Sequence, residues 1–207
     1  MKTDPKALIY SIFEKHVPDP VSHYCFDLWE EYRFNFLVAK KRSTKLGDYR
    51  YSGHEQSHTI TINNNLNKYS FLVTYLHEVA HLLTYSEYKN KVSPHGHQWK
   101  NNFQQLLIPI LNDLVFPADI IVHLKNYINN PKASSCSDHN LAKALSAYDE
   151  NENSLVHLSE VKSGNKFRFN RKVYQMEAVK RTRIICKELS SGRKFLISGI
   201  AQVEILA

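Results

Sequence analysis

The spacing of hydrophobic residues divides the chain into helical and extended stretches. In residues 1–32, apolar positions recur at helical intervals in two groups, which predicts two helices separated by Pro18 and Pro20. Three short strands are predicted next, at residues 34–39, 45–51 and 58–63. The last of these, HTITIN, alternates most clearly between polar and apolar residues, so we expect a half-exposed strand there.

A long helix is predicted over residues 68–85, because its apolar residues fall at positions i, i+3, i+4, i+7, i+8 and i+11. These residues are Leu72, Tyr75, Leu76, Val79, Ala80 and Leu83. Further helical patterns begin near Trp99, where Pro109 should interrupt the helix, and at Pro117. The spacing therefore indicates a core helix followed by a helical region.

The pattern changes again after Asn153, where short β runs alternate with turns, which predicts a small antiparallel sheet or barrel. Turn-forming residues concentrate at 129–138 and mark the boundary between the two parts. We therefore predict an α+β protein with a first domain over residues 1–132 and a C-terminal β module over residues 154–207. Residues 133–153 form a linker with a short helix near residues 141–148.

The candidate chemistry lies in the long helix, as the motif His77-Glu78-Val79-Ala80-His81. Histidines at i and i+4 project from one face of a helix about one turn apart, so His77 and His81 can bind one metal ion. The pair is offset from the apolar stripe, and Glu78 lies beside it, where an acid can act as general base on a water molecule. The motif is typical of zinc metallopeptidases.

A catalytic zinc site usually has three protein ligands. Glu87 stands where the extended metzincin motif has its last histidine and Thr84 replaces its glycine, which excludes that class. No glutamate occurs in residues 88–149, which excludes a ligand of the thermolysin type. His95 and His97 remain, and we choose His95 as the third ligand.

These residues resemble the SprT-like family, which includes Spartan-related metallopeptidases. The family motif, HExxH followed about fourteen residues later by His-Gly-x-x-aromatic, is matched position by position in this chain. The matching residues are His77, Glu78, His81, His95, Gly96 and Trp99. His97 falls on a variable position. The resemblance extends over about residues 20–115 and implies a zincin-like fold, a small mixed sheet with helices, and a peptidase site.

The chain departs from the family pattern in its cysteines. Many SprT-like proteins end in a cysteine-based zinc ribbon, but Cys25, Cys136 and Cys186 are too widely separated to form one. We interpret all three as reduced thiols. A second zinc ion, and any DNA binding that depends on that ribbon, is therefore not expected here.

The net charge of +7 is concentrated at the C-terminal end. Residues 155–207 carry 11 Lys or Arg and 4 Asp or Glu, whereas the rest of the chain carries 16 of each. The segment mixes basic clusters with aromatic residues, namely Lys180, Arg181, Arg183, Arg193 and Lys194 with Phe167, Phe169, Tyr174 and Phe195. We expect basic residues on one face, able to contact the phosphates of DNA or RNA, and the aromatics packed on the other. A solubilising basic surface is the alternative.

The composition is that of an ordinary globular protein, with 43% hydrophobic and 23% charged residues. Asp4, Pro5, Lys6 and Glu14 interrupt the apolar run that a signal peptide needs, so we expect a cytoplasmic protein without a membrane partner.

We consider two functions. The first is a zinc endopeptidase that acts on protein substrates, including protein bound to nucleic acid, in which His77, His81 and His95 hold zinc and Glu78 is the base. An extended substrate would add to the edge of HTITIN, and Tyr85 and His97 are weak candidates for an oxyanion stabiliser. The second is a binding module with structural zinc. The acid beside the ligands, and a structural site's need for four ligands, favour the enzyme.

Overall fold

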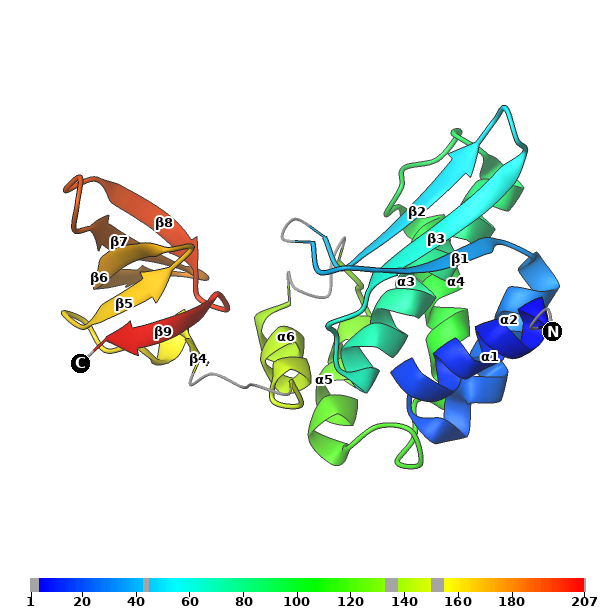
Figure 1. The fold of residues 1–207 in the computed structure, drawn as a ribbon, viewed down its shortest axis with the longest axis horizontal. Helices are drawn as coiled ribbons and strands as arrows, with labels where there is room; N and C mark the ends of the chain where they lie inside the picture. Colours follow the sequence, from blue (N-terminus) through cyan, green and yellow to red (C-terminus); the bar gives the residue numbers. More distant parts are fainter. Residues whose placement is uncertain (1–3, 43–44, 133–137, 150–154, 207) are drawn as a thin grey trace. The chain divides into compact units, whose positions relative to one another are not determined.

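The computed structural model describes residues 4–42, 45–132, 138–149 and 155–206. The chain divides into two compact units, Met1–Asp149 and Glu150–Ala207, each with its own hydrophobic core (Figure 1). The first unit combines helices with a three-stranded mixed sheet, and the second is built on a six-stranded antiparallel sheet. The predicted α+β class is therefore confirmed.

The sheet of the first unit contains β1 (Asn35–Ala39), β2 (Gly47–Ser52) and β3 (Ser57–Asn63). Their order is β1-β3-β2, with β3 parallel to β1 and antiparallel to β2. The HTITIN strand, β3, is therefore central, and the prediction that it offers an edge to substrate was wrong. The edge strands are β1 and β2.

The polar positions of β3 explain why its pattern was misleading. Thr61 and Asn63 are buried, although alternation with isoleucine indicated exposure. The amide of Asn63 accepts a hydrogen bond from Arg42 Nε (2.7 Å) and donates one to the carbonyl of Lys45 (2.8 Å), while Arg42 also donates to the Thr61 carbonyl (3.2 Å). Arg42 and Lys45 thus satisfy the side-chain amide of Asn63, which would otherwise require water.

Helices form the rest of the first unit. They are α1 (Pro5–His16), η1 (Asp19–Val21), α2 (Ser22–Tyr32), α3 (Lys68–Tyr88), α4 (His97–Leu107), η2 (Ile108–Ile110), α5 (Ala118–Ile128) and α6 (His139–Ser146). Pro109 lies in η2, directly after α4, where proline cannot continue the α-helical hydrogen bonds. The break at Pro109 is as predicted.

Helix α3 is the centre of the first unit. It contacts β2, β3, α4, α1 and α6. Apolar residues are buried on nearly all of its sides, as expected of a helix surrounded by other elements rather than by solvent. The hydroxyl of buried Tyr75 donates to the carbonyl of Cys25 (2.7 Å), which ties α3 to α2.

Helix α6, which the sequence analysis placed in a linker, packs within the first unit. Leu141 and Leu145 are buried in the same core as α3. The side chain of Asn67 donates from Nδ2 to the Leu145 carbonyl (2.9 Å), so the residue that caps α3 also holds α6.

The second unit contains β4 (Leu155–His157), η4 (Leu158–Glu160), β5 (Lys166–Phe169), β6 (Lys172–Lys180), β7 (Arg183–Glu188), β8 (Lys194–Ser198) and β9 (Gln202–Leu206). The sheet order is β4-β9-β5-β6-β7-β8, and each described pair is antiparallel. Phe167 and Tyr174 are buried and stack at 5.7 Å, and Phe195 meets Tyr174 edge-on at 5.9 Å. The aromatics thus gather on one side of the sheet.

Among the described residues, Cys25 and Cys186 are free and buried. Cys136 lies outside the described residues. No helix of the described ranges is long and apolar enough to cross a membrane.

Candidate metal centre

Helix α3 brings the HExxH motif to the middle of the first unit. The side chain of Asn67 caps its first turn by accepting hydrogen bonds from the backbone N–H groups of Tyr69 (3.1 Å) and Ser70 (2.9 Å). His77, ten residues after Asn67, begins the motif, and His81 follows one turn later. Both side chains are half-buried, whereas their apolar neighbours are fully buried. The two imidazoles therefore lie at the boundary of the core, outside the set of side chains that pack fully inside it.

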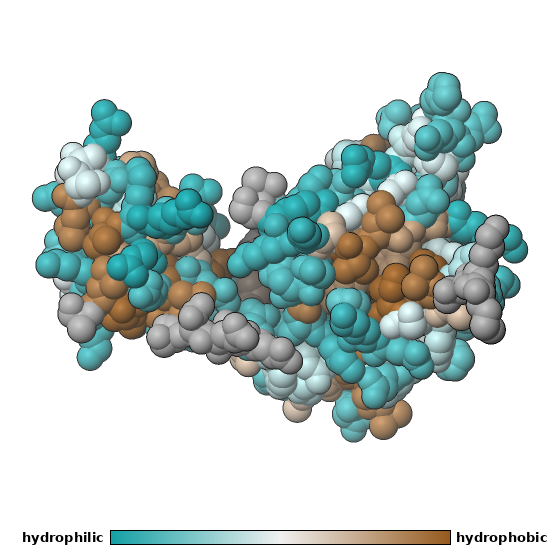
Figure 2. Space-filling model, viewed as in Figure 1, coloured by the Kyte–Doolittle hydropathy of each residue, from teal (hydrophilic) through white to brown (hydrophobic). Residues whose placement is uncertain are grey.

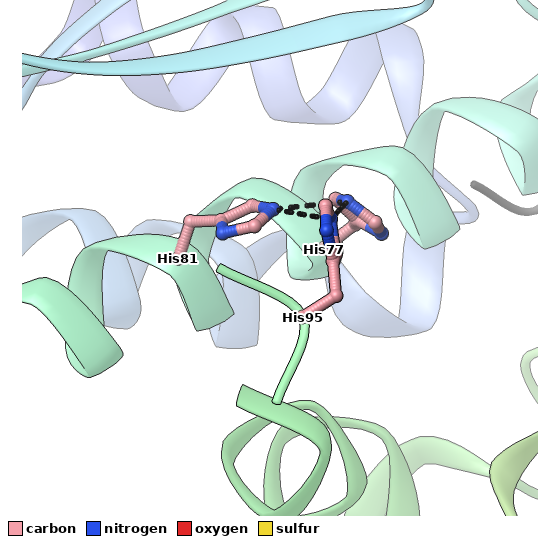
Figure 3. Close-up of side chains that lie close together, drawn as sticks. All are labelled: His77, His81 and His95. Atoms are coloured by element: carbon pink, nitrogen blue, oxygen red, sulfur yellow. Dashed lines mark hydrogen bonds between the residues drawn. The ribbon is translucent and has the colours of Figure 1, made fainter. Parts of the chain in front are cut away.

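Three imidazoles converge at this point (Figure 3). His77 and His81 come from α3, and His95 comes from the loop before α4. His81 Nε2 lies 3.2 Å from His77 Nε2 and 3.0 Å from His95 Nε2, and the third distance, from His95 to His77, is 3.4 Å. The structure thus brings together all three predicted ligands, and the group could hold a metal ion.

The donor set fits zinc. Tetrahedral ligation with Zn–N distances of about 2.0–2.1 Å places neighbouring nitrogens about 3.3 Å apart, which agrees with the 3.0–3.4 Å separations of the three Nε2 atoms. Burial and the neighbouring imidazoles lower the pKa of His77 to about 3, burial and His95 lower that of His81 to about 3, and burial lowers that of His95. The rings are thus neutral at pH 7, as metal ligation requires.

Trp99 forms the floor beneath the three imidazoles. Its ring, fully buried on α4, lies 4.6 Å from the ring of His77, 4.8 Å from that of His95 and 5.4 Å from that of His81, measured between centroids. Phe103, one turn further along α4, stacks beneath it at 5.5 Å. Both aromatics belong to the buried core, and Trp99 also restricts how the three imidazole rings can rotate.

The side chain of Glu78 points to strand β2, which packs against α3. A Cβ atom added at Gly47 would lie 2.6 Å from Glu78 Oε1, so the carboxyl group lies directly against the β2 backbone. Burial and, to a smaller degree, the charge of Asp48 raise the pKa of Glu78 to about 8, while a hydrogen bond from the backbone N–H of Tyr49 acts in the opposite direction. Three consecutive residues of β2 thus set the environment of this acid.

Tyr49 links the same strand to the group of three imidazoles. Its ring lies parallel to that of His81, at 7° and 6.4 Å between centroids, and its hydroxyl is 2.8 Å from His58 Nδ1. Tyr51 and Tyr85 continue the cluster, with their rings 4.7 Å apart. Sequence reasoning missed Tyr49. The available signal was its position in the strand predicted at residues 45–51, two residues before Tyr51.

The remaining candidates lie as follows. His97 is exposed at the first residue of α4 and does not belong to the group of three imidazoles. Tyr85 is half-buried and contacts Tyr49 and His58 by its ring, at 6.2 Å and 6.1 Å. His58 is hydrogen-bonded to the hydroxyl of Tyr49 within this aromatic cluster.

Residues 17–110 match the SprT-like family, and this range runs from the end of α1 through η2 and includes every residue of the centre. The resemblance inferred from the motif is therefore confirmed over a slightly shifted range. No curated protein and no solved structure matches the chain.

Proposed function

We propose that this chain, which carries a SprT-like family domain over residues 17–110, is a zinc-dependent endopeptidase that hydrolyses protein substrates. The observation that supports the proposal most is the convergence of three neutral imidazoles, two of them on a HExxH helix, beside a buried acid. A site that only stabilises a fold normally has four protein ligands. Within the described residues, the group consists of His77, His81 and His95 alone.

In this proposal, His77, His81 and His95 would hold zinc, which would supply Lewis-acid polarisation of the scissile carbonyl and lower the pKa of a water molecule. Glu78 accepts the proton from the attacking water and returns it to the leaving amine. Burial raises the pKa of this carboxyl to about 8 in the metal-free protein, and the positive charge of a bound zinc ion would favour the ionised form that accepts the proton. Trp99 keeps the imidazoles in place, and Tyr49 covers His81 from the side of β2.

The edge of β2 is the place where an extended substrate can lie. Among the described strands, β2 pairs only with β3, so its other edge is available for main-chain hydrogen bonds. The same strand lies against Glu78 through Gly47 and against His81 through Tyr49. A peptide added to β2 would therefore run beside both the base and a metal ligand.

Glu78→Gln tests the proposal. Glutamine keeps the shape of the buried side chain but cannot accept a proton, so zinc content and melting temperature should stay unchanged while digestion of casein disappears. The matched control is Glu87→Gln, because Glu87 is exposed on the last turn of the same helix. This control should digest casein at the wild-type rate.

The wild type and both variants are assayed with and without added DNA, so that a requirement of the activity for nucleic acid is detected. Equal digestion by the Glu78→Gln protein would exclude Glu78 as the base. Absence of digestion by the zinc-loaded wild type under all these conditions would overturn the peptidase proposal and leave a zinc-containing binding module.

A further inference from the structure

The strands β6, β7 and β8 present an outward face with an ordered pattern of charge. On β7, Ile184, Cys186 and Glu188 are buried, so Arg183, Ile185 and Lys187 point to the opposite side. The strand register extends each of these three positions into a row across the sheet, because residues paired across neighbouring strands share a face. The rows are therefore defined by pairing and by burial together.

Two of the rows are basic and the row between them is apolar. The first row is Lys166, Gln175, Lys187 and Lys194, on β5 to β8. The middle row is Ala178, Ile185 and Leu196, and the third is Lys180, Arg183 and Ser198. Arg183 and Lys187 are four residues apart on β7, so the two basic rows lie about 13 Å apart. We call this surface the striped face.

Most of the positive charge on the striped face is not neutralised. In the part of the chain that the structure describes, Lys166, Lys180, Arg183 and Lys187 form no ion pair, and all four are exposed. Lys194 is the exception, because its Nζ lies 2.8 Å from a carboxylate oxygen of Glu177. Elsewhere in the unit, Arg168 pairs with Glu204 and Lys172 with Glu188. The striped face thus carries four exposed cations that have no acidic partner in the described part of the chain.

The apolar row is accessible. Leu196, on β8, is 49% exposed. A shallow pocket on this part of the sheet is lined by Lys180, Ile185, Lys194, Phe195 and Leu196. Hydrophobic and hydrophilic patches alternate on the visible surface of the second unit in Figure 2. Apolar side chains flanked by cations offer a surface on which planar rings can pack while anionic groups meet the lysines.

We propose that the striped face binds single-stranded nucleic acid, with phosphates at the two basic rows and bases on the apolar row between them. A polyanion is favoured by the four unpaired cations, since each phosphate contact releases condensed counterions. A single strand is favoured over a duplex because only unpaired bases can reach the apolar row. The surface lies wholly within the second unit, so the proposal does not depend on the metal centre.

Binding of the full chain to fluorescein-labelled oligo(dT) and oligo(U) is measured by anisotropy as a function of salt. Four phosphate contacts on a single strand predict a slope of log K against log salt of about −2.8, or about a 50-fold loss between 50 and 200 mM. The double variant Lys180→Glu/Lys187→Glu should reduce the slope by about 1.4 and lower affinity at least 10-fold. Both DNA and RNA should bind, because neither row reads the sugar.

The matched control is Lys162→Glu/Arg171→Glu, which makes the same charge change at exposed turn residues outside β6, β7 and β8. This control should keep most of the affinity for the oligonucleotides. An equal loss of affinity in both double variants would show that binding depends only on net charge, and it would contradict the proposed site. Leu196→Ser should weaken oligo(dT) at least threefold without affecting a duplex of the same length, whereas Ile205→Ser, also at an exposed apolar residue, should not.

Melting temperatures of all variants are compared first. The substituted cations are exposed, so the charge variants should fold; they are Lys162, Arg171, Lys180 and Lys187. Two results would overturn the proposal: no binding of oligo(dT) or oligo(U) at 50 mM salt, or tighter binding of the duplex than of either single strand. The casein assay does not enter these measurements, so failure here and failure of the peptidase proposal are distinguishable.

Discussion

Gly47→Ala tests whether strand β2 holds the general base. A Cβ atom at this position would lie 2.6 Å from Glu78 Oε1 and 2.7 Å from Thr74 Cγ2. Carbon atoms in contact are normally about 3.5–4.0 Å apart, so the new methyl group overlaps both neighbours. Thr74 cannot turn away, because its side chain is β-branched and its hydroxyl donates to the Ser70 carbonyl at 2.7 Å. Either Glu78 or the strand must move.

The expected cost follows from two opposing terms. Overpacking of a well-packed site destabilises by about 1–3 kcal/mol, and replacing glycine by alanine stabilises by about 0.4–1 kcal/mol through the unfolded chain. The net loss is about 1–2 kcal/mol, which lowers the melting temperature by about 2–8 °C for a chain of this size. The control is Gly53→Ala, where the nearest atom to a new Cβ, Tyr51 Cε1, is 4.0 Å away. Its melting temperature should be unchanged or slightly higher.

Thermal unfolding, zinc content and casein digestion are measured on both variants. Gly47→Ala should retain zinc, because the three histidines lie on α3 and in the loop before α4, not on β2. Its digestion rate should fall at least tenfold, because displacement of a base by about 1 Å costs up to two orders of magnitude. If Gly47→Ala matches Gly53→Ala in both melting temperature and activity, β2 does not position Glu78.

Two further predictions concern the metal ligands. His95→Ala should lose zinc and His97→Ala should keep it, since only His95 belongs to the group of three imidazoles; metal analysis showing the reverse would make His97 the ligand. Metal-free protein should become less stable as pH falls from 6.5 toward 3, because burial lowers the pKa of His77 and His81 to about 3 and the unfolded chain then binds more protons. Between pH 6.5 and 8, the stability of the metal-free protein should instead fall as pH rises, because the pKa of Glu78 in the folded state is raised to about 8 from 4.5. In urea unfolding, Glu78→Gln should remove this fall above pH 6.5 and keep the fall at low pH.

Local periodicity predicted the elements of the metal domain well. The predicted helix at residues 68–85 corresponds to Lys68–Tyr88, and the predicted strand at residues 58–63 to Ser57–Asn63. Helical spacing also predicted that His77 and His81 share a face, because two residues four positions apart are neighbours whatever surrounds the helix. The third ligand is fourteen residues further on and lies in a loop, so a motif rather than periodicity was needed to choose His95.

The order of the strands could not be predicted in the same way. Pairing joins residues far apart in the sequence, and the alternation of HTITIN is compatible with either an edge or a central strand. The decisive contacts come from Arg42, which hydrogen-bonds Asn63 and the Thr61 carbonyl and so allows the Asn63 side chain to be buried. Nothing in the spacing of β3 itself indicates that partner.

The same limitation applies to Tyr49, and it changes how the centre is understood. The motif describes the site as a property of α3 and of the loop that carries His95. In the structure, β2 is equally involved, because Gly47 allows its backbone to approach the carboxyl of Glu78 and Tyr49 stacks on His81. In the proposed peptidase, an edge strand that contacts both Glu78 and His81 would link substrate binding to the geometry of both side chains. Substitutions in β2 are therefore expected to alter catalysis without removing any residue of the HExxH motif.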